Sequence, residues 1–223
     1  MDIHAPLEPI HNWKDIAIHL GIVTIGLFIA LMLEGLVEYV HHRHIVAEAR
    51  ANIRQEIEDN HKAAQDNVKD LDRNIRAMES NIRTIHLLEQ KAAGHLSLVN
   101  SMQYSAMGDA AWSTARDTGA LAYMPYAEVQ RYADIYTEQS DVNQQANRAA
   151  HNEFQLLAPT VMGTDFKDLP PGEFDAMLHG SASSLLDLCV LRQVIEQLDQ
   201  QYVNDLGGAN NSVKIDSCSN LMQ

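Results

Sequence analysis

The strongest constraint on the fold is an uncharged apolar run near the N-terminus. Residues 20–33 carry no charge, and apolar residues continue on both sides from about residue 16 to residue 40. Three polar residues interrupt this longer run: His19, Glu34 and Glu38. Trp13 and Tyr39 flank it, and at helical rise they stand roughly 39 Å apart, about the thickness of a bilayer with its headgroups. The pattern predicts one transmembrane helix over residues 15–40.

Two other structures could explain the same run. A cleaved signal peptide needs a basic segment before the run and a small-residue cleavage site just after it. Here acidic side chains outnumber basic ones before the run, and the Ala-x-Ala sequence from Ala47 to Ala49 lies too far downstream. A buried helix of a soluble protein is the other alternative. We favour the membrane span, with residues 1–14 as a short N-terminal tail.

Two signals disagree about which side of the membrane holds the C-terminal part. One lysine precedes the span and three arginines follow it: Lys14, then Arg43, Arg50 and Arg54. The positive-inside rule therefore places the C-terminal part in the cytoplasm, although the rule loses force when a long domain follows. The two cysteines, Cys189 and Cys218, favour the opposite side, because an even count permits one disulfide in an oxidising compartment.

Small residues in the run have the spacing of helix-pairing motifs. Ala17 and Gly21 stand four residues apart, and so do Gly26 and Ala30. Small side chains at that spacing let two helices approach closely within lipid. The span is therefore a candidate for pairing with a second membrane helix.

A group of ionisable residues follows at the end of the span. Glu34, Glu38 and either His41 or His42 share one face of a helix. Glu38-x-x-His41 has the spacing found in di-metal carboxylate bundles, but one copy would serve only in an oligomer. A metal site or a proton relay is one interpretation, since ionisable groups at membrane depth are often functional. The plainer one, which we favour, is that these groups are hydrated at headgroup level.

Residues 41–93 predict a long helix that continues from the span. Neither proline nor glycine occurs from residue 45 to residue 93, and Gly94 follows as a helix-terminating glycine. From Ala64 onward, consecutive apolar residues are alternately four and three positions apart, which is the pattern of a heptad seam. The apolar residues are Ile57, Ala64, Val68, Leu71, Ile75, Met78, Ile82 and Ile85. His61 takes a seam position, where a polar side chain can set register. The seam faces either a second copy or helices of the same chain.

Residues 94–206 predict an acidic helical domain. A partly helical segment, 94–124, precedes a helix from Pro125 to about Leu157, and a last helix spans roughly 173–205. The apolar stripe of the first of these helices contains Val129, Tyr132, Ala133, Tyr136, Ala146, Ala150, Phe154 and Leu157. That of the last contains Leu185, Leu188, Leu191 or Arg192, Ile195, Leu198 and Tyr202.

The expected fold is all-α, with an N-terminal transmembrane helix continuing into a long amphipathic or coiled-coil helix that packs with a distal helical bundle. No segment shows the alternation of a convincing strand pair. Residues 207–223 form a polar tail, in which Cys218 could fold back on Cys189.

Charge and missing motifs exclude several function classes. The net charge is −14, of which −10 lies in residues 94–223, whereas phosphate binding needs clustered lysine and arginine. We therefore expect no nucleic-acid partner. The chain has no phosphate loop, no Gly-x-Gly-x-x-Gly, no Gly-x-Ser-x-Gly and no His-Glu-x-x-His. We expect neither a cofactor nor enzymatic activity.

Several short motifs resemble those of an uncharacterised family of bacterial single-pass membrane proteins. They are Gly-x-x-x-Ala-Leu at 26–31, Ile-x-x-Glu-Ile-x-x-Asn at 53–60, and a Trp–Gly–Tyr pattern formed by Trp112, the Thr-Gly-Ala-Leu at 118–121, and Ile135-Tyr136. The resemblance implies an architecture, not an activity: one span in the bacterial inner membrane and a helical C-terminal domain. With the cysteine pair, it favours a periplasmic domain.

Three functions are compatible with these features. The first is a non-enzymatic, membrane-anchored scaffold or accessory subunit that self-associates through the span and the heptad helix or joins a larger membrane assembly. The second is a ligand-sensing helical ectodomain that acts through a partner, since the short N-terminal tail cannot hold an output domain. The third is a metal or proton site at the Glu/His group after the span. The lipid bilayer is a partner in all three.

Overall fold

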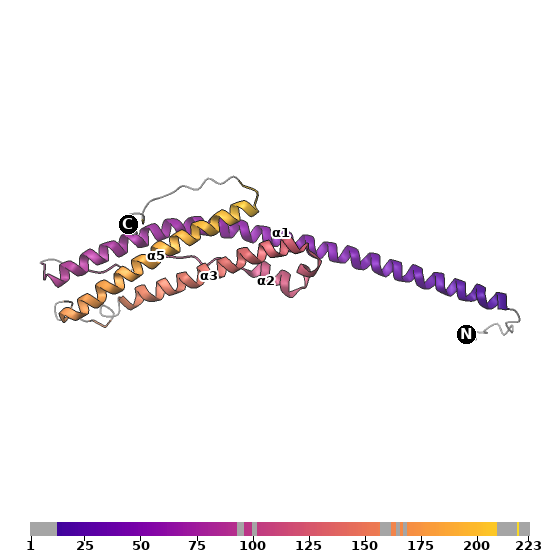
Figure 1. Ribbon diagram of the computed structural model, residues 1–223, viewed down its shortest axis with the longest axis horizontal. Helices are drawn as coiled ribbons and strands as arrows, with labels where there is room; N and C mark the ends of the chain where they lie inside the picture. Colours follow the sequence, from indigo (N-terminus) through magenta and orange to yellow (C-terminus); the bar gives the residue numbers. More distant parts are fainter. Residues whose placement is uncertain are drawn as a thin grey trace, which may run out of the picture. The chain divides into compact units, whose positions relative to one another are not determined.

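A computed structural model of the chain describes residues 13–92, 96–99, 102–156, 162–163, 166, 169–208 and 218 (Figure 1). They form the α-helices α1 (Trp13–Glu89), α2 (Ala110–Asp117), α3 (Tyr126–Leu156) and α5 (Pro171–Asp205), and the 3₁₀ turn η1 (Ala120–Tyr123). The described residues contain no strand, which confirms the all-α fold.

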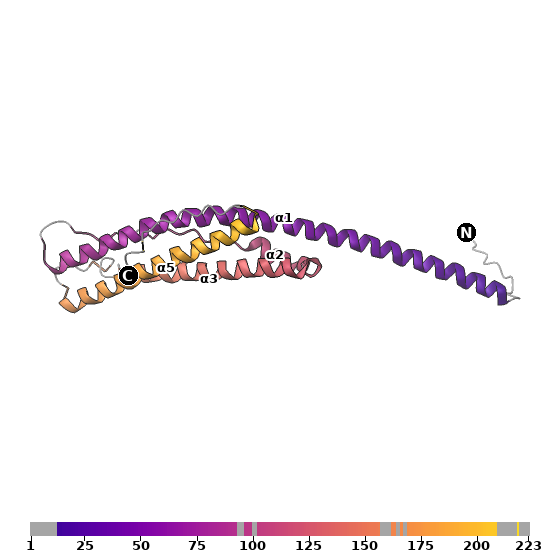
Figure 2. The same cartoon turned by 45° about the horizontal axis from the view of Figure 1, so that its top comes forward.

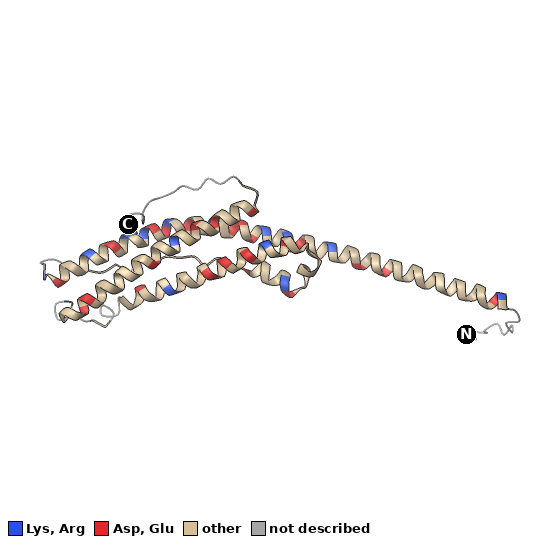
Figure 3. Cartoon of the chain, in the orientation of Figure 1, with Lys and Arg blue, Asp and Glu red and all other residues tan. Residues whose placement is uncertain are grey.

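Helix α1 runs through two compact units, residues 1–48 and residues 49–223. In the first unit α1 carries the apolar run, where large side chains such as Phe28 are exposed (62%). Figure 3 shows that few charged residues interrupt this part of the helix. The helix is long and apolar enough to cross a membrane. It begins at Trp13, so the last two residues of the expected tail are helical, and residues 1–12 lie outside the described part.

The second unit brings residues 49–89 of α1 together with α2, η1, α3 and α5. Figures 1 and 2 show the three long helices side by side in this unit. Residues 49–89 therefore share a core with the helices of the acidic part, which the sequence analysis treated as a separate domain.

The heptad seam of α1 is buried by its own chain. Most of its residues are buried: Ile57, Ala64, Leu71, Ile75, Met78 and Ile85. At the seam position that the sequence analysis singled out, His61 Nδ1 lies 2.6 Å from Asp199 Oδ1 of α5. Of the two partners left open for the seam, the structure supplies the second, helices of the same chain.

The ends of α1 and α5 differ little from those expected. α1 stops at Glu89, and Lys91 takes the left-handed conformation with φ 53° while the Ala92 N–H donates to the carbonyl of Leu87 (3.0 Å). This is the hydrogen-bond pattern of a Schellman end. Gly94, the expected terminator, lies outside the described residues. After α5, Gly207 adopts φ 74°, which agrees with its expected role as a stop.

The stripe of α5 is confirmed, whereas that of α3 is wrong in its last turns. Every expected stripe position of α5, including both Leu191 and Arg192, is buried. In α3 Phe154 is exposed (56%), and the buried face continues instead through Ala149 and Glu153. The step from Ala146 is three residues and then four, so the apolar Phe154 falls one position off the core face.

A buried ion pair joins α1 to α5. Arg192 Nε lies 2.7 Å from Asp72 Oδ1, and both side chains are almost fully buried. Arg192 Nη1 also lies 3.1 Å from Glu196 Oε1, one turn further along α5. Desolvation offsets much of the attraction in such a pair, whereas loss of one partner leaves an uncompensated buried charge. The pair therefore disfavours other registers of α5 against α1.

Four asparagines of α1 hold the extended connector that leads to α2. Asn60, Asn67, Asn74 and Asn81 are all buried and stand seven residues apart; we call them the asparagine ladder. Each side-chain amide donates to the carbonyl and accepts from the N–H of one connector residue. The distances are 2.8 and 2.8 Å for Asn67 with Ser105, and 2.8 and 2.8 Å for Asn81 with Val99.

The other two rungs have the same form. Asn60 pairs with Gly108 at 2.7 and 2.9 Å, and Asn74 pairs with Gln103 at 3.0 and 3.3 Å. The connector therefore runs antiparallel to α1. A buried backbone needs a partner for each N–H and C=O, and the asparagine amide supplies both, as a neighbouring strand would.

The even spacing of the four asparagines along α1 can be compared with the spacing of their partners along the connector. The 21 residues from Asn60 to Asn81 cover about 31 Å of helix. Gly108 and Val99, which pair with these two asparagines, are nine positions apart in the sequence, an average of three for each heptad of α1. A seven-residue repeat also returns the asparagines to nearly the same face of α1. The connector therefore advances by three residues on average for each heptad of α1, although its individual steps between rungs are four, two and three residues.

We expect Asn67→Ala to lower the free energy of unfolding by about 2–4 kcal/mol, because it leaves the N–H and the carbonyl of Ser105 without partners. Thermal unfolding of the full chain in detergent, followed by circular dichroism, measures the change. Asn52→Ala, at an exposed asparagine of the same helix, is the matched control and should change stability by less than about 0.5 kcal/mol. Equal effects of the two substitutions would contradict a specific role for the ladder.

Candidate functional site

The Glu/His group at the end of the apolar run is not gathered around one point within the single chain. His42 Nε2 lies 3.9 Å from Glu38 Oε1, and the rings of His41 and His42 are 6.1 Å apart. Glu34 is exposed two turns before His41. Among the described residues, no three His, Cys, Asp or Glu side chains are placed to hold a metal ion together. The structure thus pairs Glu38 with His42 but does not bring the predicted ligands together.

The small residues of the span are accessible in the single chain. A Cβ built on Gly21 or Gly26 meets no heavy atom within 4 Å, and Ala17 and Ala30 are exposed. Among the described residues, none fills the space beside Gly21 or Gly26. Pairing with a second helix through them stays a prediction.

The two cysteines form the disulfide that the sequence analysis left open. Cys189 of α5 is bonded to Cys218, with the two Cα atoms 5.9 Å apart, and both residues are buried. The bond closes a loop of 29 residues, for which chain entropy gives roughly 3–4 kcal/mol. It ties Cys218 of the C-terminal tail to the middle of α5.

Residues that carried the family resemblance meet in one cluster, which we call the capping node: Glu56, Trp112 and Tyr136. The Glu56 carboxylate accepts hydrogen bonds from the backbone N–H groups of Ala111 (2.8 Å) and Trp112 (3.3 Å), in the first turn of α2. The Tyr136 hydroxyl donates to the same carboxylate at 2.7 Å. A carboxylate at a helix N-terminus satisfies free N–H groups and interacts favourably with the helix dipole.

Aromatic packing closes the capping node. The rings of Trp112 and Tyr136 stack with centroids 5.4 Å apart and planes 7° from parallel. Burial, followed by the hydrogen bond to Glu56, raises the pKa of Tyr136, so its hydroxyl is a stable donor at neutral pH. The node therefore attaches α2 to both α1 and α3.

A buried polar network lies next to the node, around Gly108. Gln139 donates to the Gly108 carbonyl (2.8 Å) and accepts from Asn60 (2.9 Å) and from the Tyr202 hydroxyl (2.6 Å). Burial is the main cause that raises the pKa of Tyr202. Because these groups satisfy one another, the network fixes the positions of α1, α3 and α5 and does not present a reactive group to a substrate.

An ion pair with two hydrogen bonds joins α1 to the first turn of α3. Arg50 Nε lies 2.7 Å from one oxygen of Glu128, and Arg50 Nη2 lies 2.6 Å from the other. The Arg50 hydrogen bond is the main cause that lowers the pKa of Glu128. The Glu128 carboxylate is mostly covered, whereas the Arg50 side chain is 43% exposed, so solvent screens part of the interaction.

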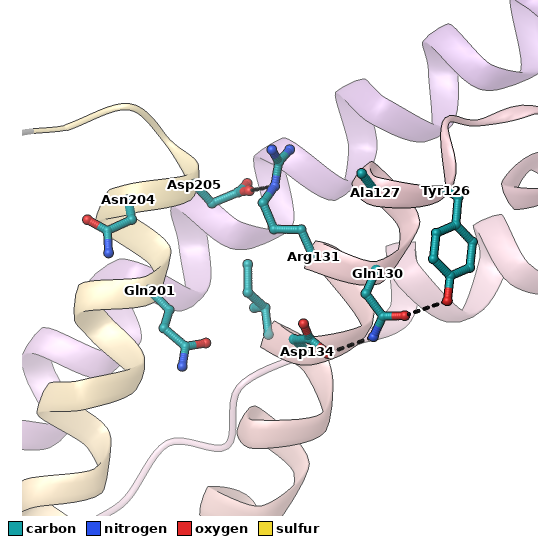
Figure 4. Close-up of a pocket in the computed structure, with 9 residues that line it drawn as sticks. Tyr126, Ala127, Gln130, Arg131, Asp134, Gln201, Asn204 and Asp205 are labelled. Atoms are coloured by element: carbon teal, nitrogen blue, oxygen red, sulfur yellow. Dashed lines mark hydrogen bonds and ion pairs between the residues drawn. The ribbon is translucent and has the colours of Figure 1, made fainter.

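The α3–α5 groove, between the first turns of α3 and the last turns of α5, is one hollow in the described part of the second unit with room for a small ligand (Figure 4). Another, of about 580 Å³, lies near the other ends of these helices and is lined by residues that include Gln155, Met177 and Ser184. The α3–α5 groove has a volume of about 640 Å³ and is lined by residues of both helices, among them Tyr126, Gln130, Arg131, Asp134, Gln201, Asn204 and Asp205. Figure 4 shows that several of them engage one another: Gln130 bridges Tyr126 and Asp134, and Arg131 pairs with Asp205. The labelled set contains no serine, cysteine or histidine that could act as a nucleophile or base at neutral pH.

The sequence analysis missed the asparagine ladder, the groove and the capping role of Glu56. The ladder has a signal that could have found it, because four asparagines at strict seven-residue spacing place four amides on nearly the same face of a helix. Glu56 was noted only as part of a motif. The groove has no such signal, since its polar residues come from two helices far apart in sequence and resemble any solvated face.

We expect Glu56→Gln to lower the stability of the second unit by about 1–2 kcal/mol and to weaken the near-ultraviolet circular dichroism from the Trp112–Tyr136 stack. The amide keeps the shape but loses the charge that favours the N-terminus of α2. Glu58→Gln, on the same helix and paired with Arg54 at the surface, is the matched control. If both variants retain the aromatic signal and the same midpoint, the carboxylate at position 56 is not a cap.

The Arg50–Glu128 pair should make stability depend on pH. The pKa of Glu128 is lower in the folded chain than its unfolded value near 4.5. The stability that the ion pair contributes is therefore fully present above that unfolded pKa and is lost as pH falls through the folded-state pKa. We expect Glu128→Gln to melt about 3 °C below the parent chain at neutral pH and to converge with it in acid. Melting curves of both proteins between neutral pH and about pH 3 test this; a constant difference at every pH would be incompatible with it.

Comparison with known proteins identifies no relative: no family model, no curated protein and no solved structure matches the chain.

Proposed function

We propose that the chain is a non-enzymatic, membrane-anchored helical protein that serves as a scaffold or accessory subunit of a membrane assembly. The observation that carries the proposal is the apolar part of α1. Its large side chains, from Ile16 to Val40, are more than half exposed to solvent in the single chain. Burial in lipid removes this apolar surface from water, and a helix that is apolar all round is typical of a membrane span.

The second unit supports a structural role. Its buried polar side chains, in the asparagine ladder, the capping node and the network at Gly108, bond to one another or to backbone. Such networks make a fold rigid and specific. A rigid body with an anchor suits a protein whose task is to hold a position in an assembly.

Self-association through the heptad seam of α1, which the sequence analysis considered, is replaced here by self-association through the span. The apolar residues of the seam are covered by helices of the same chain, so they are not available to a second copy. Self-association would use the small residues of the span, Ala17, Gly21, Gly26 and Ala30, where space beside the helix is open.

The disulfide favours the oxidising side of the membrane for the second unit, hence the periplasmic side of a bacterial inner membrane. The count of arginines favours the cytoplasm, but residues 49–223 form a long folded unit, and long domains are translocated largely regardless of such charges. We therefore give the disulfide more weight.

Membrane fractionation tests the anchor. We expect the full chain to stay in the membrane pellet at alkaline pH, and Leu27→Arg/Leu31→Arg to shift it toward the soluble fraction, because each arginine at the centre of a span costs about 3 kcal/mol. Leu87→Arg, at an exposed leucine of the second unit, is the matched control and should not change the partition. Recovery of the parent chain in the soluble fraction would refute the anchor.

The same cells report the orientation. A phosphatase that is active only in the periplasm, fused after Gln223, should be active. In protein unfolded by denaturant, which exposes both buried side chains, Cys189 and Cys218 should resist a thiol-alkylating reagent until a reductant is added. An inactive fusion together with free thiols would place the second unit in the cytoplasm.

A further inference from the structure

We propose that the outward face of α5 is an interface through which two copies of the chain pair in parallel. The centre of this face is formed by five residues that we call the outer seam: Ser183, Leu186, Val190, Gln193 and Gln197. The proposal rests on the anchor and the self-association proposed above, and it adds a second contact between copies, located in the second unit.

The outer seam has the spacing of a coiled-coil face. Its five residues are three, four, three and four positions apart, which is the heptad alternation that keeps side chains on one side of a helix. All five are exposed, and the two large apolar side chains, Leu186 and Val190, are 50% and 42% exposed. The stripe of α5 from Leu185 to Tyr202 is buried in the core. α5 therefore carries a second seam that faces away from its own chain.

The outward face of α5 has no charged side chain along most of its length. Beyond Asp175, no exposed residue of this helix is an aspartate, glutamate, lysine or arginine. The outward faces of the other two long helices differ, since α1 exposes Lys69 and Arg76 and α3 exposes Asp134 and Asp141. Charged residues are depleted at the centres of protein interfaces. Of the three faces, that of α5 therefore has the composition of an interface centre.

The chemistry of the outer seam favours a second copy of this chain as its partner. In a symmetric parallel pair, each seam residue faces the same residue of the other copy, so a charged residue would face its own sign. A serine hydroxyl and a glutamine amide each hold a donor and an acceptor, so Ser183, Gln193 and Gln197 can bond to their own counterparts. A foreign partner would gain specificity from opposite charges, which the outer seam does not offer.

The proposed anchors supply the orientation and the local concentration that such a pair needs. Copies inserted through the same span point the same way across the membrane, so a two-fold axis perpendicular to the membrane relates them. With α5 along that axis, the two outer seams are parallel. The seam covers about 21 Å of helix, which is short for an interface that acts alone. Pairing of the spans makes the seam contact intramolecular and raises its effective concentration.

Disulfide cross-linking of the full chain in membranes tests the pairing. Ser183→Cys and Gln193→Cys, made one at a time, place a thiol at two levels of the outer seam about 15 Å apart. Cys189 and Cys218 are bonded to each other, so the introduced cysteine is the free thiol. Under mild oxidation we expect both variants to form a covalent dimer. The yield should be at least about tenfold above that of Gln144→Cys, an exposed position on α3 that serves as the matched control.

Charged variants test whether seam residues face their own counterparts. In the Gln193→Cys background, Leu186→Glu/Val190→Glu should lower the dimer yield at least about fivefold, because carboxylates of the two copies then face one another. Coexpression with Leu186→Lys/Val190→Lys in the same background should restore the yield. Ser140→Glu/Gln144→Glu, two exposed α3 residues at the same spacing, is the matched control and should leave the yield unchanged. Melting curves check that each variant is folded.

The remaining outcomes separate the outer seam from the anchor. A dimer at only one of the two cysteine levels would mean that the helices cross, and it would overturn the parallel pair. If neither cysteine forms a dimer, the proposal fails: labelling by a water-soluble maleimide would then show a seam open to water, and absence of labelling would show a seam covered by another segment or another protein.

The location of the chain in the same samples distinguishes the two proposals. A monomer in the membrane pellet leaves the anchor standing and refutes the outer seam. A dimer in the soluble fraction refutes the anchor and leaves the outer seam standing. A monomer in the soluble fraction refutes both.

Discussion

An extended backbone that lies against a helix has no natural hydrogen-bond partner, because the helix has already paired its own N–H and C=O groups. The asparagine ladder removes this difficulty, since each amide offers the acceptor and donor of a peptide group at the end of a side chain. The rest of the second unit depends on this placement. It delivers Gly108 to the network with Gln139 and Tyr202, and then brings the first turn of α2 to the carboxylate of Glu56. Trp112 reaches Tyr136 only because the connector ends at that point.

Patterns of apolar residues predicted most of the fold. The apolar run was recognisable by its lack of charge. The heptad seam and the stripe of α5 were recognisable by their period, because the large apolar side chains of a buried helix face recur every three or four residues. The stripe of α3 was misassigned where Glu153 takes a core position and Phe154 does not, since a pattern of apolar residues cannot register a buried acid. The asparagine ladder was missed for the same reason. Its residues are polar and buried, and what they satisfy is backbone 18 to 48 residues further along the chain.

The candidate sites were predictable to a smaller extent. Two cysteines permitted a disulfide without requiring one, and the capping node was visible as short motifs without a stated role. The predicted metal ligands share a helix face, but a single straight helix spreads side chains along its axis and cannot wrap them around one ion.

The ladder also couples the length of α1 to the length of the connector, two lengths that usually vary independently in helical proteins. Loops between helices normally tolerate insertions, because extra residues bulge into solvent at little cost. Here the steps between neighbouring rungs vary by one residue around an average of three, so a lasting change in the length of the connector has to be matched by a change in the length of α1. One heptad added to α1 would be matched by about three residues in the connector, which is the ratio of the helical and extended rises. Homologous chains of different size should therefore change both segments together, in steps of about seven and three.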